Sequence, residues 1–352
     1  MVGRVKQTIV EKLSQSGIRR LGSPARGFRY RAASGRAVSA RECARIEALR
    51  IPPAWKSVAI HSSRHAWVQA VGQDIKGRWQ YLYHAKQVVR RERAKLERLV
   101  RFIRALPQFR RAVRRDLALP GLSQDRVLAG IARILETCQL RPGGEVYARE
   151  NGSFGIATLR ARHVSVRGQV LRFDFVGKSG KRQVHELKDR EVAKLVRDLL
   201  RHRGEVFKYR NDQGTITDIK GHHINAYIRD RMGERFTAKD FRTWAGTLLA
   251  ARALARMPPE SRSAPAAARR AIAQMLREVS GYLGNTPAVC RASYVFPVVL
   301  RCFEQGRILR HPGTGPPRGT RALERCERSL LGLLGSTAQG KPSRKASSRS
   351  AG

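Results

Sequence analysis

The chain has 352 residues, a length that fits about two domains, and hydrophobic residues make up 41% of it. Its 71 basic residues, 15 Lys and 56 Arg, far outnumber the 27 acidic ones, so the formal net charge is +44. This charge attracts polyanions such as nucleic acid or an anionic membrane, and argues against enzymes that act on small cations.

The first 90 residues are expected to form an arm and then a small β-rich domain. Residues 1–35 are basic and dotted with Gly and Ser, which predicts a mobile N-terminal arm. Ser39 followed by Glu42 fits a capping box that opens a helix. Aromatic and β-branched runs separated by glycines follow between residues 57 and 83, a pattern typical of strands. We therefore expect a β-rich domain over residues 36–90.

Residues 91–335 are expected to form a second, mainly helical domain with a small embedded sheet. A charged helical segment is interrupted at Pro107, and further helices continue to residue 139. Short alternating runs over residues 141–187 predict strands: EVYARE, FGIATL, HVSVRG, VLRFDFVG and RQVHEL. Five helices are predicted after them, over residues 189–203, 218–232, 239–256, 265–283 and 287–305. The basic, low-complexity sequence of residues 336–352 predicts a disordered tail.

The sequence shows no pattern for a membrane span or a metal site. No stretch approaches the about 20 apolar residues that cross a bilayer, and the start of the chain lacks the apolar core of a secretory signal. Five cysteines, at positions 43, 138, 290, 302 and 326, have no zinc spacing. Gly177-Lys178-Ser179 is not a phosphate-binding P-loop, because Arg172 replaces the required earlier glycine. We expect no metal, no cofactor, no membrane contact and a reducing, cytoplasmic compartment.

Four separated motifs carry residues that suit chemistry on a phosphodiester. Arg141 precedes a Pro-Gly-Gly turn, and Lys178 lies in a predicted turn between two strands. Arg242 lies in the first turns of a helix, within KDFRT. Tyr294 ends GNTPAVCRASY, about two turns into a helix for which Thr286-Pro287 supplies the cap and first position. Taken singly, each would be an ordinary surface or packing residue.

The order and spacing of these motifs resemble one family, the type IB DNA topoisomerases, in the compact form found in bacteria and poxviruses. IPPAW at 51–55 and GQDIKGRWQYLYH at 72–84 resemble the family's DNA-clamping domain, and the likeness covers roughly residues 25–310. It implies an α+β fold in which a β-rich domain and a mainly α-helical catalytic domain, with a three-stranded antiparallel sheet, form a clamp around DNA. It also implies relaxation of positive and negative supercoils by transient single-strand cleavage, rotation and religation, without ATP or metal.

The resemblance implies a role for each residue. Tyr294 would be the nucleophile that forms a 3′-phosphotyrosyl link and releases a 5′-hydroxyl strand. Arg141 and Arg242 would hold the non-bridging oxygens, because guanidinium forks suit them. Lys178 would be the general acid that protonates the departing 5′ oxygen. The residues that would contact DNA are Gln80, Tyr81, Tyr83 and Lys239.

One position departs from the family's pattern. The poxviral and eukaryotic pattern has His where this chain has Asn285, nine residues before the tyrosine. An amide can still donate a neutral hydrogen bond to a non-bridging oxygen, but it cannot carry charge or a proton. We interpret Asn285 as a substitution within the bacterial members, and as a catalytic residue in place of the histidine.

Two alternatives remain open from the sequence. A tyrosine site-specific recombinase has a similar catalytic domain, but typically shows His-x-x-Arg where this chain has Lys239-x-x-Arg242. It also usually carries a helical N-terminal domain rather than a strand-rich one. A non-catalytic DNA-compacting protein would explain the charge but not the ordered motifs. The expected partner is double-stranded DNA, and for the topoisomerase we expect a monomer that acts at the bacterial nucleoid.

Overall fold

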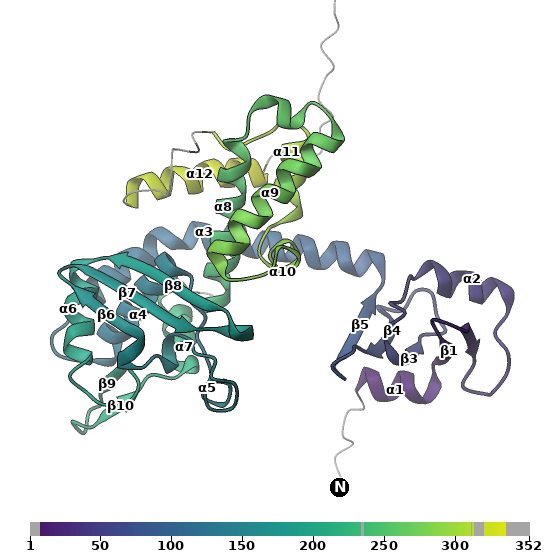
Figure 1. The fold of residues 1–352 in the computed structure, drawn as a ribbon, viewed down its shortest axis with the longest axis horizontal. Helices are drawn as coiled ribbons and strands as arrows, with labels where there is room; N and C mark the ends of the chain where they lie inside the picture. Colours follow the sequence, from purple (N-terminus) through teal and green to yellow (C-terminus); the bar gives the residue numbers. More distant parts are fainter. Residues whose placement is uncertain (1–7, 234–235, 311, 313–319, 336–352) are drawn as a thin grey trace, which may run out of the picture. The chain divides into compact units, whose positions relative to one another are not determined.

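The computed structural model describes residues 8–233, 236–310, 312 and 320–335. The chain divides into two compact units between Leu96 and Glu97, inside helix α3 (Ala85–Leu117) (Figure 1). The tail predicted over residues 336–352 lies outside the described residues.

The first unit is a five-stranded antiparallel sheet with the strand order β2-β1-β3-β4-β5. Its strands are β1 (Ile18–Ser23), β2 (Gly27–Arg31), β3 (Lys56–Ile60), β4 (Val68–Gln73) and β5 (Trp79–Tyr83). Successive side chains of a strand point to opposite faces. Ala59 therefore packs with Leu13 of α1 (Ile9–Ser16), whereas Ile60 packs with Ile46 of α2 (Ala40–Ala48).

The prediction of a mobile arm over residues 1–35 is wrong for residues 9–31. These residues form α1, β1 and β2, and β1 pairs with both β2 and β3. Thr8 and Glu11 form a capping box at the start of α1. This capping signal is present in the sequence, but the basic, glycine-containing composition of residues 1–35 favoured the prediction of an arm. The sheet of the first unit thus begins well before residue 36.

The second unit is mainly helical and carries a three-stranded antiparallel sheet, β6-β7-β8, formed by Val164–Arg167, Val170–Val176 and Arg182–Lys188. Its helices after α3 are α4 (Gln124–Cys138), α5 (Glu145–Asn151), α6 (Arg190–Leu199), α7 (Gly221–Met232), α8 (Ala238–Ala255), α9 (Pro265–Leu283), α10 (Pro287–Ser293), α11 (Pro297–Glu304) and α12 (Thr320–Gly335). A short ribbon, β9 (Lys208–Arg210) with β10 (Ile216–Asp218), precedes α7. The α+β fold class with its small antiparallel sheet is confirmed.

Three local predictions between residues 107 and 159 are wrong. Pro107 does not interrupt α3, because the helix keeps a continuous buried face that includes Leu106 and Phe109. The expected strand EVYARE is helix α5, which begins after Gly144 and ends on Gly152 in the left-handed conformation. FGIATL likewise ends in a turn of 3₁₀ helix, Ile156–Thr158, instead of a strand.

The helix predicted over residues 287–305 is two helices, α10 and α11. Proline disfavours the helical conformation of the residue before it, and Phe296 before Pro297 is extended, with φ −72° and ψ 132°. Tyr294 is therefore the C-terminal cap of α10 rather than a residue inside a longer helix. Helix α12 was not predicted at all.

Candidate active site

The residues predicted from the second unit's motifs meet around one open pocket. It is lined by Arg141, Lys178, Lys239, Arg242, Asn285 and Tyr294, together with Lys181 and several small residues. They come from the segment after α4, the β7–β8 turn, the start of α8, the α9–α10 loop and the end of α10. The fold thus gathers side chains that lie far apart in the sequence.

Local packing holds the backbone of Tyr294. The Thr286 hydroxyl accepts a hydrogen bond from the Val289 N–H at 3.2 Å and starts α10. At the other end, Thr247 Oγ1 donates to the Tyr294 carbonyl at 3.0 Å. A Cβ added to Gly246 would lie only 2.9 Å from that same carbonyl oxygen. Sequence analysis missed Gly246 and Thr247, whose only signal was small residues on the buried face of α8.

Arg242 is buried beside the tyrosine, with 3% of its surface exposed. Its Nη2 donates to the Leu283 carbonyl at 2.8 Å, and its Nη1 donates to the Gln139 carbonyl. Its Nε lies 3.5 Å from Tyr294 Oη, and its guanidinium carbon lies 4.9 Å from the centre of the tyrosine ring. Two backbone carbonyls therefore orient the guanidinium toward the phenol.

Arg141 and Asn285 form a second pair in the pocket. Arg141 Nη2 donates to Asn285 Oδ1 at 2.5 Å. Because a guanidinium can only donate, this contact leaves Nδ2 as the free end of the amide. That Nδ2 is buried and has no hydrogen-bond partner among the residues that the structure describes. A buried donor without a partner costs about 1–3 kcal/mol, so an acceptor supplied by a ligand would satisfy it.

The charges around Tyr294 favour its ionised form. Burial raises the pKa of the phenol, but the charges of Arg242 and Arg141 and their hydrogen bonds outweigh it, so the pKa lies below its usual value. Burial, and then the charge of Arg242, lower the pKa of nearby His185 to about 4. His185 is therefore neutral at physiological pH and adds no charge to this site.

The β7–β8 turn presents Lys178 at the exposed edge of the pocket. The Gly177 N–H donates to the Lys181 carbonyl at 2.8 Å, and both Ser179 and Gly180 are left-handed. Lys181 Nζ in turn donates to the Asn285 carbonyl at 2.9 Å, which ties the turn to the α9–α10 loop. Lys181 was not predicted as a site residue.

The DNA contacts predicted in the first unit fall on two faces of β5. Tyr81 and Tyr83 share one face with their ring centres 6.2 Å apart, and the Arg91 guanidinium lies 3.8 Å from the centre of the Tyr83 ring. Gln80 points to the opposite face, where its Nε2 donates to Asp74 Oδ2 at 2.9 Å. The structure therefore groups the two tyrosines but separates Gln80 from them.

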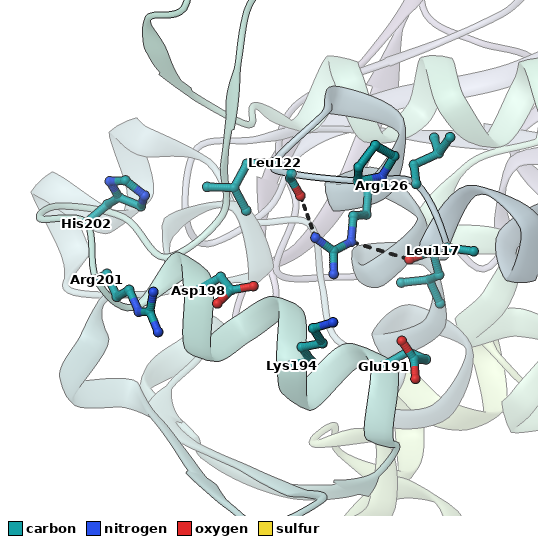
Figure 2. A pocket seen from close by; sticks show the side chains of 12 residues that line it. Leu117, Leu122, Arg126, Glu191, Lys194, Asp198, Arg201 and His202 are labelled. Carbon is teal, nitrogen blue, oxygen red and sulfur yellow. Dashed lines mark hydrogen bonds between the residues drawn. The ribbon is translucent and has the colours of Figure 1, made fainter.

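Another pocket of the second unit contains none of the predicted residues (Figure 2). It lies between the α3–α4 turn and α6, and its buried Arg126 donates to the carbonyls of Leu117 and Gly121. Across the described parts of the chain, no group of three or more His, Cys, Asp or Glu residues could hold a metal ion. No helix in those parts is long and apolar enough to cross a membrane.

Comparison with known proteins decides the family. Residues 82–302 match the family described as the catalytic core of eukaryotic DNA topoisomerase I, and residues 27–74 match the N-terminal domain of bacterial DNA topoisomerase IB. The chain belongs to the type IB DNA topoisomerases. This topoisomerase is 32% identical over 303 residues to DNA topoisomerase 1B of Acanthamoeba polyphaga mimivirus, covering 84% of this chain and 89% of the relative.

A more distant relative is DNA topoisomerase 1B of Vaccinia virus (strain Copenhagen), 21% identical over 278 residues, or 75% of this chain and 82% of the relative. The match to DNA topoisomerase 1 of Mycosarcoma maydis, 22% identical over 249 residues, covers 63% of this chain and 24% of the relative. Family membership makes this chain a topoisomerase that acts on DNA, and decides against the recombinase and the DNA-compacting protein.

Proposed function

We propose that this topoisomerase relaxes positive and negative supercoils by cutting one strand with Tyr294, allowing rotation, and resealing the strand. The observation that carries the proposal is the pocket in which Arg242 lies against Tyr294 and the Asn285 Nδ2 donor has no partner among the described residues. The residue roles below follow from that arrangement and from the chemistry of each side chain.

In the cleavage step, Tyr294 Oη forms a bond to the phosphorus of a DNA phosphodiester. The bond from phosphorus to the 5′ oxygen breaks, and its electron pair stays on that oxygen. The phenolic proton passes to solvent, and Lys178 gives a proton to the departing oxygen as general acid. The products are a 3′-phosphotyrosyl link and a 5′-hydroxyl strand, and religation reverses each transfer.

The non-bridging oxygens gain charge as the phosphorus becomes five-coordinate. Arg141 and Arg242 would neutralise that charge, and Asn285 Nδ2 would donate a neutral hydrogen bond. The amide is already oriented, because Arg141 Nη2 lies 2.5 Å from Asn285 Oδ1. The phosphotyrosyl ester conserves the free energy of the broken bond, so the proposed cycle uses neither ATP nor a metal ion.

The two units are proposed to act as a clamp on duplex DNA. Tyr81, Tyr83 and Gln80 on β5 would contact DNA from the first unit, and Lys239 would contact it at the pocket. We place the functional division near residue 90, with the catalytic domain reaching residue 335 and a basic tail beyond it. We further propose a monomer that works at the nucleoid in a bacterial cytoplasm.

The covalent intermediate tests this proposal. Duplex DNA nicked just beyond the cleavage site traps the enzyme, because the short 5′-hydroxyl fragment dissociates. With the wild type, an adduct that resists SDS should carry a label from the 5′ end of the cut strand and none from its 3′ end. Tyr294→Phe should form no adduct while still binding DNA. A label retained from the 3′ end only, or an adduct formed by Tyr294→Phe, would refute it.

A further inference from the structure

Helix α4 ends in a conformation that its sequence does not favour. Gln139, its C-terminal cap, is left-handed with φ 49° and ψ 34°. Residues with a Cβ avoid this region, and helices that end in it usually use Gly. Helices α5, α7 and α9 of this protein follow that rule with Gly152, Gly233 and Gly284. The left-handed glutamine at the same position of α4 therefore needs a structural explanation.

The side chain of Gln139 stabilises the left-handed cap. It is buried, with 6% of its surface exposed, and its Nε2 donates to the Glu136 carbonyl at 2.6 Å. The Gln139 N–H donates to the Leu135 carbonyl at 3.1 Å. Gln139 therefore caps the last turn of α4 with two hydrogen bonds, one from its side chain and one from its backbone.

The turn that supports Gln139 is itself anchored in the core. The Glu136 carboxylate accepts from Arg110 Nε at 2.5 Å, and Arg110 also pairs with Glu327 of α12 at 2.6 Å. At most 5% of each of these three side chains is exposed. Because α3, α4 and α12 meet in this buried group, the end of α4 has little freedom to shift.

The left-handed cap turns the Gln139 carbonyl toward the active site, where it accepts from Arg242 Nη1. We propose that Gln139 is a positioning residue, whose carbonyl fixes the guanidinium of Arg242 so that Nε faces Tyr294. The inference rests on the proposed function, because it gives the Arg242–Tyr294 contact a catalytic purpose. Without the carbonyl in this place, Leu283 would be the one backbone acceptor left to Arg242 among the described residues.

The test uses substitutions that change the backbone preference at position 139. Val is β-branched and disfavours the left-handed region, so Gln139→Val should swing the carbonyl away from Arg242. Gln139→Gly accepts the region freely and should rescue most of the rate. Val127→Ala, a truncation in the buried face of the same helix, serves as a control for lost stability alone. Gln139→Ala is used if the Val variant does not fold.

The readout is single-turnover cleavage of the nicked duplex, measured across pH, beside thermal unfolding. Gln139→Val should cleave at least about tenfold more slowly at neutral pH, because small displacements of positioned groups are costly. Its rate should also keep rising to higher pH than the wild-type rate, since Tyr294 would lose the cation whose charge lowers its pKa most. Val127→Ala should lower the melting temperature and leave the pH profile unchanged.

A double-mutant cycle separates the outcomes. In an Arg242→Ala background, Gln139→Val should cause little further loss, because Gln139 acts through Arg242. Two results, each with Tyr294→Phe inactive, would overturn the inference about Gln139 and leave the proposed function standing. One is additive losses in the double-mutant cycle, and the other is an unshifted pH profile in Gln139→Val. Cleavage by Tyr294→Phe would instead overturn the proposed function. A Gly variant as slow as the Val variant would also contradict the role of the left-handed cap.

Discussion

At the scale of single residues, the pocket is built from donors. Arg141, Arg242 and the Nδ2 of Asn285 are all hydrogen-bond donors. Arg141 binds the Oδ1 end of the amide and leaves Nδ2 without a partner among the described residues. In the proposed mechanism, Asn285 would make the hydrogen bond that a histidine makes at this position in the family's pattern, but an amide does not titrate. Catalysis in the proposed mechanism would therefore depend on the amide's geometry rather than on its charge.

This dependence gives a prediction for position 285. Asn285→Ala should slow single-turnover cleavage by about 10–100-fold, the usual effect of removing one donor to a developing charge. Asn285→His should retain cleavage, and its rate should fall as rising pH removes the proton from the imidazolium. The wild type should show no such inflection near the pKa of histidine. Equal rates for the Ala variant and the wild type would remove Asn285 from the site.

At the scale of elements, close helix packing positions Tyr294, the proposed nucleophile. A Cβ on Gly246 of α8 would lie 2.9 Å from both the Tyr294 Cβ and the Tyr294 carbonyl. Gly246→Ala should therefore displace Tyr294, reduce cleavage at least about tenfold and lower the melting temperature. A Cβ at Gly332 of α12 meets no other described residue within 4 Å, so Gly332→Ala should keep activity and gain about 0.5–1 kcal/mol from helix propensity. An active, more stable Gly246→Ala enzyme would contradict this account.

Prediction from sequence succeeded for elements whose local pattern is strong. Strands β6–β8 alternate clearly, and α9 was predicted at its observed bounds because Pro265 and Gly284 mark its ends. The break between α10 and α11 was missed, although Pro297 signals it. Residues Gln139, Gly246 and Lys181 could not be found, because their roles come from contacts with distant segments that no local pattern records. The predicted pocket residues were found through the family resemblance.

At the scale of the whole molecule, the net charge of +44 suits a protein that binds DNA through its phosphates. Such binding releases counterions, so affinity should fall steeply as salt rises, largely irrespective of DNA sequence. The proposed function makes chemistry and binding separable: the pocket residues would control cleavage, while the many surface arginines would control affinity. Relaxation at high salt should be limited by dissociation rather than by the rate of cleavage.

The central claim, a metal-independent and ATP-independent tyrosine enzyme, is tested by relaxation of supercoiled plasmid with EDTA present and ATP absent. Positively and negatively supercoiled plasmids are each incubated with the wild type and with Tyr294→Phe. The wild type should relax both, and the Phe variant, folded and still bound to DNA, should relax neither. Equal relaxation by the two proteins would show that Tyr294 is not the nucleophile, and wild-type relaxation that requires a metal ion or ATP would contradict the mechanism.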